Sequence, residues 1–432
     1  MSQKIQFRRG TDAARQTVVF DLGEPVFTTD TNKFYLGNGT TTGGALAGGN
    51  FNSSESYTIV ETTSSEITNG TNLLTAVNAA MSKTPYGKPL SSGNQYSVLL
   101  HPAVYDLVNS GAVIDNHNIN IVGLSNNPRD TIIKRNMDQS TLYGTINLLY
   151  NITGNSIRNL HLQAINTGAI GVLAPLYLSA ITYPSFENLT LDNLILTSIS
   201  GNYEDTLLST KPALVIGGVT LKNAKFNNIK CYGDFLVSKF NLRIGSFWMN
   251  NCEVNGEYFR KTFSSSYAQE AKVTNCRFIS ETGQAFQLEA LTKTDKTNVF
   301  SNCYFKASGG FFGGTTLTTT KQMNAQFINC EFEGPILTFN GLMKNCIINT
   351  TGYTGAAIRN DISSTASLAV PIYQNCLILS NSTAGVPTVS GNPTSSGIFI
   401  GCTLNKAIYT GTTGYFPNES IGNVISPYML QV

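Results

Sequence analysis

Two carboxylates of this chain have a spacing that would allow them to act together in catalysis. Glu331 and Glu333 stand two residues apart in an alternating stretch, so on a strand they would lie about 6.6 Å apart on one side. Glycosidases place their two carboxyl groups roughly 5 to 9.5 Å apart. If the protein is an enzyme, we expect hydrolysis by Glu331 with Glu333 or Glu289, with one pKa raised by the neighbouring charge. Any solvated strand with this alternation has the same geometry, so the pair fits a plain surface equally well.

Four further side chains could bind a sugar without changing it. Trp248 is the only tryptophan and offers a flat ring, although an aromatic residue at the start of a strand more often packs into a core. Arg260 and Gln287 lie in the longer connections of the chain, and loops on a rigid framework often carry function. Tyr304 completes this set of candidate glycan contacts.

Other catalytic and metal-binding chemistries find no support in the sequence. His101, His117 and His161 are scattered, and there is no Walker loop, H-E-x-x-H or G-x-S-x-G sequence. No group of Asp and Glu is dense enough for Ca²⁺. The eight cysteines include no C-x-x-C pair, so we expect reduced, buried thiols. We expect no metal and no cofactor.

Charge and hydropathy argue against two classes of partner. Lys and Arg number 28 and Asp and Glu 26, a net charge of +2 without a basic run, so a nucleic acid is not expected. No apolar stretch reaches the ~18 residues of a membrane helix, and the first residues lack an apolar signal core. Only 12% of the residues are charged, against roughly 25% in ordinary domains. Such a surface suits sister chains or neutral glycans.

A hexapeptide repeat organises most of the chain. Its form is apolar, any residue, Asn, small residue or Cys, any residue, apolar, and successive Asn residues from Asn251 to Asn329 are 24, 27 and 27 apart. A period in this range indicates a solenoid. The copies cover residues 114–119, 157–162, 186–191, 221–226, 249–254, 273–278, 300–305, 327–332, 343–348, 373–378 and 399–404, the last with Gly401 in place of Asn.

Asn at the third position predicts a corner between two strands. Asn tolerates left-handed backbone, and its side chain can bond to the Asn of the next coil, about 4.8 Å away. The apolar and Cys positions then face inward, so Phe278, Phe305 and Phe332 should stack. The predicted ladder consists of Asn251, Asn275, Asn302, Asn329, Asn345 and Asn375.

Two spacings depart from the period. The step from Asn116 to Asn159 is 43 residues, which predicts two coils, one of them without the motif. The step from Asn329 to Asn345 is 16 residues, which is short for a full coil.

The residue before the last apolar position should point outward. Glu253 and Arg277 would then be cross-strand neighbours that form a weak surface ion pair. The column becomes apolar at Ile347 and Leu377, which favours contact with a sister chain. The predicted column is His161, Thr190, Lys225, Glu253, Arg277, Tyr304, Glu331, Ile347, Leu377 and Thr403.

The Asn corner, the Cys column and the aromatic stack together resemble the right-handed parallel β-helix of the pectin-lyase-like family. The resemblance implies an all-β fold, with the solenoid over residues 97–410 and a C-terminal cap over 411–432. Residues 43–70 are then a linker and a segment leading into the solenoid. Residues 71–96 hold a capping helix and a lead-in to the first strand.

The capping helix is predicted over residues 71–81. Leu73, Val77, Ala80 and Met81 share one helical face behind a Thr and Asn cap. So short a helix is marginal in water, so we expect its apolar face to plug the open N-terminal end of the solenoid.

Residues 1–42 form a separate module. Lys4–Thr11 reads K-I-Q-F-R-R-G-T, G-E-P follows at Gly23, and Asp30–Thr40 reads D-T-N-K-F-Y-L-G-N-G-T. Short alternating runs joined by turn residues predict a β-meander, which is too small to stand alone and should fold against partners. The signature resembles the N-terminal domain shared by bacteriophage tail fibres and the major tropism determinant. That resemblance implies attachment to a virion in a trimeric adhesin.

Two functions of different classes follow from the resemblances. In the first, the chain is a homotrimeric phage tail spike or fibre, attached to other virion proteins through residues 1–42, that binds a host cell-surface glycan. In the second, the same spike is a polysaccharide depolymerase, either a hydrolase or a lyase. The sparse acidic residues favour the first. A head fibre or other virion decoration is a third alternative, and the expected location is in each case the virion, assembled in the bacterial cytoplasm.

Overall fold

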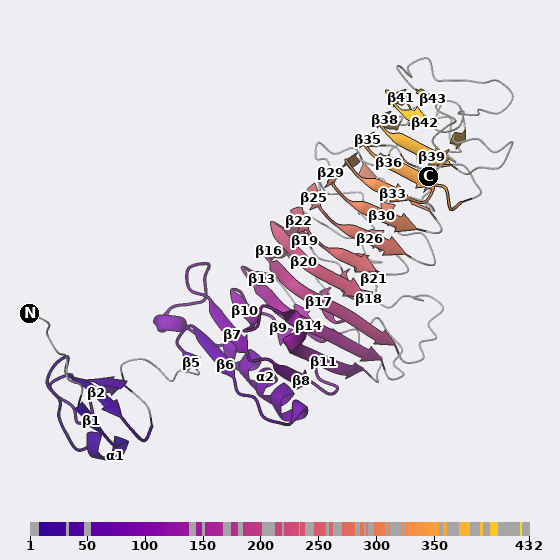
Figure 1. Cartoon of the computed structure of the whole chain (residues 1–432). Coiled ribbons are helices and arrows are strands. Elements are labelled where there is room, and N and C mark those ends of the chain that lie inside the picture. The colour runs from indigo at the N-terminus through magenta and orange to yellow at the C-terminus, as the bar shows by residue number, and fades with distance from the viewer. Residues whose placement is uncertain are drawn as a thin grey trace, which may run out of the picture.

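The computed structural model of the chain is built mainly from β-strands that follow one another, in sequence order, along a solenoid (Figure 1). In the part of the chain that the structure describes, no helix is long and apolar enough to cross a membrane. The described residues are 8–31, 34–46, 53–137, 144–148, 152–166, 174–179, 185–200, 212–217, 220–232, 234–237, 246–255, 259–261, 270–280, 286–288, 291–292, 298–307, 310–311, 321–322, 325–337, 339, 341–353, 357–360, 371–380, 389–391, 398–404 and 424–425.

The N-terminal module is a four-stranded sheet with a one-turn helix. Its strands β2, β3 and β4 pair antiparallel, as in the predicted meander. The prediction is wrong for β1, which pairs parallel with β2, because helix α1 begins the crossover that lets both strands run the same way. Phe20, Val26 and Tyr35 form the buried core. The elements are β1 Arg8–Gly10, α1 Asp12–Arg15, β2 Pro25–Thr28, β3 Phe34–Leu36 and β4 Ala45–Leu46.

From Asn159 to Gly401, the coils turn at a corner with left-handed backbone. Strands on both sides of the corner belong to one bent, 24-stranded sheet. We call the strands before the corner the leading face and those after it the trailing face. The leading face holds β7 Tyr96–Leu100, β10 Ile119–Gly123, β22 Ser246–Asn250, β25 Glu270–Thr274, β29 Asn298–Ser301, β32 Ala325–Ile328, β35 Leu342–Lys344, β38 Ile372–Gln374 and β41 Ile398–Ile400. Three strands span the corner: β14 Ser156–Asn166, β17 Thr190–Ser200 and β20 Ala224–Tyr232.

The trailing face and a third face complete each coil. The trailing face holds β8 Ala103–Asp106, β11 Thr131–Met137, β23 Glu253–Asn255, β26 Arg277–Ser280, β30 Tyr304–Ala307, β33 Glu331–Glu333, β36 Ile347–Thr350, β39 Leu377–Ser380, β42 Thr403–Leu404 and β43 Val424–Ile425. The third face holds β9 Ala112–Ile114, β12 Ile146–Leu148, β15 Leu176–Ser179, β18 Pro212–Gly217, β21 Asp234–Val237, β24 Phe259–Lys261 and β27 Phe286–Leu288, then β34 Ile336–Leu337, β37 Ile358–Asn360 and β40 Val389–Gly391.

Short elements lie between these faces. They are β13 Ile152–Thr153, β16 Ser185–Glu187 and β19 Thr220–Lys222 in a three-stranded parallel sheet, the antiparallel pair β28 Leu291–Thr292 and β31 Lys321–Gln322, and the 3₁₀ turns η1 Pro85–Gly87 and η2 Pro128–Asp130. Strands of successive coils pair in parallel on all faces. The predicted right-handed parallel β-helix is therefore confirmed.

Left-handed backbone occurs where the hexapeptide places the turn. The Asn residues of the corner have φ between 52° and 57°, and Gly401 has φ 62°. Side-chain amides of neighbouring coils donate to one another, with Nδ2 to Oδ1 distances of 2.9 to 3.5 Å. Asn275 instead donates to Asn250. The corner row is Asn159, Asn193, Asn228, Asn251, Asn275, Asn302, Asn329, Asn345, Asn375 and Gly401.

The register of the early coils differs from the prediction. Asn188 and Asn223, which belong to recognised hexapeptides, bond to each other in a second, short row. The corner row passes through Asn193 and Asn228, in copies that the sequence reading missed, at residues 191–196 and 226–231. Thr190 and Lys225 consequently lie on the leading face, and their assignment to the outward column of the trailing face is wrong.

The two irregular spacings also resolve. Strands β10 and β11 both pair directly with β14, so one long coil, and not two, separates Asn116 from Asn159. The left-handed residue of the first copy is Asn118, not Asn116. The coil from Asn329 to Asn345 is complete although short, since it contributes β33, β34 and β35 to the three faces and the two amides still bond at 3.2 Å.

A single apolar core fills the solenoid. Phe305 stacks between Phe278 and Phe332, with ring centroids 5.2 and 4.8 Å away, as predicted. All eight cysteines are free and buried, also as predicted. The thiols of the column donate to backbone carbonyls, as Cys303 does to Ser301 at 3.3 Å. Burial raises the pKa of the Cys231 thiol, which keeps it protonated and inert.

The helix and the first coil begin earlier than predicted. Helix α2 spans Glu66–Ala80, with Ser65 as its N-cap, so the expected cap near Thr71 is wrong. Leu73, Val77 and Ala80 are fully buried in the core at the N-terminal end of the solenoid, as expected. The segment predicted to lead into the solenoid holds β5 Ser53–Ser54 and β6 Tyr57–Val60, and β6 already pairs with β7, so the solenoid begins before the predicted residue 97.

Candidate functional site

The outward column of the trailing face follows the predicted order from β23 onward. Glu253 and Arg277 are cross-strand register partners, as predicted. The Arg277 guanidinium, however, lies over the ring of Tyr304, 4.9 Å from its centroid. Upstream, the column continues through Lys230 and Ile195 to His161. The register partners from Lys230 onward are Lys230, Glu253, Arg277, Tyr304, Glu331, Ile347, Leu377 and Thr403.

A polar cluster on this face holds the predicted carboxylates. The Tyr304 hydroxyl donates to Glu333 Oε2 at 2.5 Å, and Lys306 Nζ lies 2.7 Å from Glu333 Oε1. The hydrogen bond from Lys306, followed by that from Tyr304, lowers the pKa of Glu333. Burial, followed by the hydrogen bond to Glu333, raises the pKa of Tyr304 to about 12.

These contacts bear on the predicted catalytic pair. Glu331 is exposed and follows Tyr304 in the outward column. A general acid needs a raised pKa, and the expectation that one of the pair gains it from the other is wrong for Glu333, because Lys306 and Tyr304 stabilise its charged form. Glu333 therefore suits a permanently charged carboxylate. Glu289 lies outside the described residues.

The structure separates the predicted glycan contacts. Trp248 lies on the leading face, half-buried between Lys225 and Lys272 of the neighbouring coils, while Met249 beside it is buried. Its expected place in the core is therefore wrong. Arg260 and Gln287 are register partners in strands β24 and β27 of the third face, so their predicted place in connections between coils is wrong. Tyr304 is on the trailing face. The four candidates thus stand on three different faces and form no single site.

A polar cleft lies at the start of the leading face, where the sequence predicted no site. Its volume is about 420 Å³, and amide and hydroxyl side chains form most of its lining. The lining residues are Ser92, Gln95, Asn118, Asn120, Thr153, Gly154, Asn155, Ser156, Arg158, Asn188 and Thr190. Only the corrected register brings these residues together, since their spacing in the sequence follows no motif.

Most buried polar groups around the cleft are paired. Ser156 Oγ donates to Asn120 Oδ1 at 2.7 Å, and Asn120 Nδ2 donates to Gln95 at 3.0 Å. Asn118 is the exception. The residue is only 5% exposed, and its buried side-chain Oδ1 accepts no hydrogen bond. An orphaned buried acceptor is uncommon and asks for an explanation.

Metal chemistry finds no ready site in the described residues. Among them, no three His, Cys, Asp or Glu side chains gather closely enough to hold a metal ion. His161 bonds to Thr197 at 3.0 Å and to Gln163 at 3.3 Å. Burial, with a smaller effect from the charge of Arg129, lowers the pKa of His161 to about 4.

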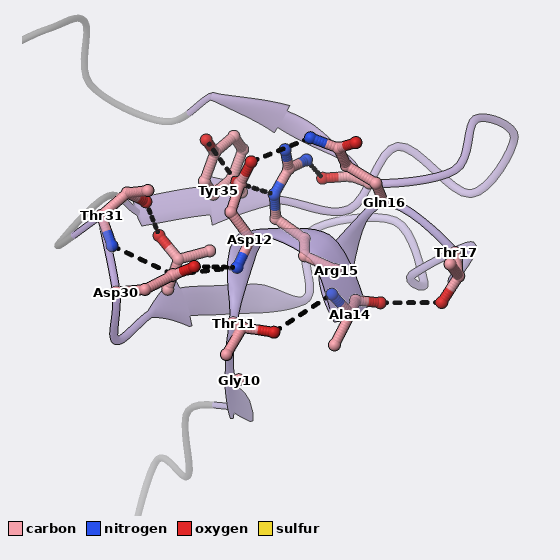
Figure 2. A network of polar contacts seen from close by, with 12 residues as sticks. Gly10, Thr11, Asp12, Ala14, Arg15, Gln16, Thr17, Asp30, Thr31 and Tyr35 are labelled. Carbon is pink, nitrogen blue, oxygen red and sulfur yellow. Dashed lines mark hydrogen bonds and ion pairs between the residues drawn. The ribbon is translucent and has the colours of Figure 1, made fainter.

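The N-terminal module is organised around Asp12 (Figure 2). The Asp12 backbone N–H donates to both carboxylate oxygens of Asp30 at 2.9 and 3.0 Å. Its carboxylate accepts from Arg15 at 2.9 Å, Gln16 at 2.8 Å and Tyr35 at 3.1 Å. The hydrogen bond from Arg15 leads the effects that lower the pKa of Asp12.

Arg15 ties this network to the end of the module. Its guanidinium lies 3.6 Å from the centroid of the Tyr35 ring and donates to the backbone carbonyl of Gly43. Thr11, the last residue of the R-R-G-T sequence, caps α1 by accepting from Ala14 N–H. The signature residues of the module therefore hold a defined polar centre.

Comparisons with known proteins agree with this division. Residues 5–41 match the family described as the major tropism determinant N-terminal domain, so the resemblance seen in the sequence is confirmed for this module. None of the curated proteins compared with the chain matches it.

Several solved structures are similar to the chain at low identity. The A-module of mannuronan C-5 epimerase AlgE6 from Azotobacter vinelandii has a TM-score of 0.42 at 11% identity, over 83% of this chain and 95% of that one. The catalytic domain of a GH87 alpha-1,3-glucanase has a TM-score of 0.41 at 11% identity, over 90% and 74%. The Dettilon tailspike protein has a TM-score of 0.36 at 10% identity, over 83% and 62%.

Proposed function

We propose that this protein is a bacteriophage virion protein, a tail spike or fibre that binds a glycan of the host surface. The observation that carries the proposal is the match of residues 5–41 to the major tropism determinant N-terminal domain. The module would attach the chain to the virion, and the solenoid behind it would present its outer faces to the host.

The solenoid suits recognition because its outward positions are independent of its fold. Inward positions repeat the same apolar pattern in every coil, whereas outward neighbours such as Lys272, Val299 and Gln326 differ freely in chemistry. Fold alone does not decide between binding and catalysis on such a surface. Of the two candidate catalytic carboxylates that the structure describes, Glu333 is neutralised by Lys306, so we infer binding without cleavage.

The C-terminal coils support a homotrimer. Ile347, Ile372 and Ile400 are exposed by 39%, 36% and 37%, and they lie on the two faces that flank the corner row, in the last coils of the solenoid. Exposed apolar patches of this kind mark association with another chain, and closed symmetry is the rule among identical subunits. We call this surface the apolar stripe; it consists of Leu342, Ile347, Ile372, Leu377, Ile398 and Ile400.

Deletion of residues 1–50 tests the attachment role. Every described strand of the solenoid, from β5 at Ser53, remains in this variant, so it should stay folded and bind host cells while being absent from purified virions. The full-length comparison is Arg15→Ala, which removes the side-chain contacts to Asp12, Gly43 and the Tyr35 ring and leaves the rest of the module in place. A truncated chain that still enters virions would overturn the proposed role of the module.

Cleavage of the same glycan is the alternative function, and carboxylate variants test it. Glu331→Gln and Glu333→Gln, with Glu289→Gln, are incubated with host-surface polysaccharide, and new reducing ends and unsaturated uronates are measured. We expect no release of oligosaccharide by the unchanged protein. Release that one of these variants abolishes, with binding retained, would establish a depolymerase instead: a lyase if the new ends are unsaturated uronates, and a hydrolase if they are saturated.

A further inference from the structure

We propose that the polar cleft lined by Asn118, Ser156 and Thr190 binds one anionic sugar residue of the host glycan. The glycan would continue from there along the leading face, past Lys225 to Trp248. The inference rests on the proposed function and names the site and the charge class of its ligand. The chemistry of the lining, the orphaned Asn118 oxygen and the charges of the neighbouring column each support it.

The cleft has the size and lining of a sugar site. Its volume of about 420 Å³ falls within the range of small-ligand sites, roughly 300 to 1,000 Å³. Amides and hydroxyls both donate and accept, as sugar hydroxyls require. The cleft forms because residues 92–95 lie over the start of the leading face, where Gln95 bonds to Asn120.

Asn118 indicates that a donor is missing from this site. Its Oδ1 is buried without a partner, while its backbone N–H donates to Asn155 Oδ1 at 3.2 Å and fixes the residue in place. The neighbouring Gly154 has φ +74°, and a Cβ there would come within 2.2 Å of Asn118 Oδ1. A side chain at residue 154 would collide with this oxygen, so only glycine can pack against it. A sugar hydroxyl entering the cleft is a donor that could satisfy the acceptor once Gly154 shifts.

The charge beside the cleft favours an anion. Arg158 lines the cleft and is exposed, and its guanidinium makes no hydrogen bond or ion pair to any residue that the structure describes. Its acidic register neighbour, Asp192, accepts from Asn228 at 3.1 Å. A guanidinium can bind a carboxylate or a phosphate through two parallel hydrogen bonds.

The outward column of the leading face extends the site. Ser156, Thr190, Lys225, Trp248 and Lys272 are successive register partners. Because neighbouring strands are about 4.8 Å apart, Trp248 lies about 9.6 Å from Thr190, a span that a short oligosaccharide covers. Lys225 is exposed and Trp248 half-buried with an outward ring, so the column offers a cation followed by an aromatic platform.

Binding measurements on single variants test the site. The probe is surface polysaccharide purified from a bacterial strain that the unchanged full-length protein binds, used in its native, carboxyl-reduced and dephosphorylated forms. We expect Arg158→Gln and Lys225→Gln each to weaken binding at least tenfold, the loss of a charge-assisted hydrogen bond, and Thr190→Val to weaken it severalfold. Lys344→Gln is the matched control, because Lys344 stands in the same column as Arg158 but in the apolar half.

The outcomes separate this inference from the proposed function. Loss of binding on carboxyl reduction assigns the anion to a carboxylate, and loss on dephosphorylation assigns it to a phosphate; either supports the site. Equal binding by Arg158→Gln, Thr190→Val and Lys344→Gln, with polysaccharide still bound by the unchanged protein, overturns the site and leaves the adhesin. No binding to any polysaccharide overturns both. Unchanged melting temperatures show that the variants are folded, as expected for exposed Arg158 and Lys225.

Discussion

The two halves of the leading face differ sharply although one backbone pattern builds both. In the first half, the outward positions carry Ser156, Thr190, Lys225, Trp248 and Lys272, and the face includes the polar cleft. In the second half, the same column carries Leu342, Ile372 and Ile398. The inner positions are apolar in both halves. The difference shows that the core of a solenoid fixes its shape, while outward positions are free to specialise, here in a ligand surface and an apolar one.

The largest effect should come from charging the apolar stripe. The double variant Ile372→Glu and Ile400→Glu should convert the trimer to a monomer, because burying two carboxylates at an interface without partners is unfavourable. Light scattering during size-exclusion chromatography measures the mass. Lys225→Glu, in the polar half, should leave the trimer intact; a double variant that remains trimeric would mean that the stripe is not an interface.

The next effect concerns the core that both halves share. Phe305→Ala removes a fully buried ring stacked on Phe278 and Phe332, which should lower the free energy of unfolding by about 3 to 5 kcal/mol. Denaturant titration followed by circular dichroism measures the loss. Phe305→Leu keeps most of the volume and should cost less. A loss below about 1 kcal/mol for the Ala variant would contradict the stacked core.

A smaller effect is expected at the corner. Asn302→Ala removes the side-chain hydrogen bonds to Asn275 and Asn329. It also places Ala, which tolerates left-handed backbone less well than Asn, at φ 53°. We expect a loss of about 1 to 3 kcal/mol. Asn302→Gly should cost less, as Gly401 occupies the same position in the last coil. Equal stability of both variants and the unchanged protein would refute this role.

The smallest effect should be a pH dependence on the trailing face of the early coils. The pKa of His161 is lowered to about 4, below the unfolded value of about 6.5, so the folded state binds fewer protons between these values. Stability from this group is complete above about pH 6.5 and falls as the pH drops towards 4. His161→Gln, which keeps a polar partner for Thr197, should reduce the pH dependence of the thermal unfolding midpoint across this window. An unchanged slope would show that another group is responsible.

The sequence predicted the coils with a clear Asn-Cys motif better than those without it. From Asn251 onward, the corner and the inward residues lie where the hexapeptide places them, since Cys and Phe repeat at fixed offsets. Upstream, two coils each hold two Asn residues with left-handed backbone, Asn188 with Asn193 and Asn223 with Asn228, and local pattern cannot tell which of the two continues the corner row. Because of this ambiguity, the sequence pattern assigned Thr190 and Lys225 to the wrong face and did not predict the cleft.

The sequence alone determined the properties that a single hexapeptide contains. These are the turn at Asn, the inward placement of the residues that flank it, and the burial of unpaired thiols, because backbone preference and side-chain alternation act over a few neighbouring residues. Only the tertiary structure decided which residues of neighbouring coils lie side by side. Asn118, Ser156 and Thr190 meet in one cleft because the register between parallel strands depends on the length of each whole coil. The coils differ in length, and a local sequence pattern does not specify that length.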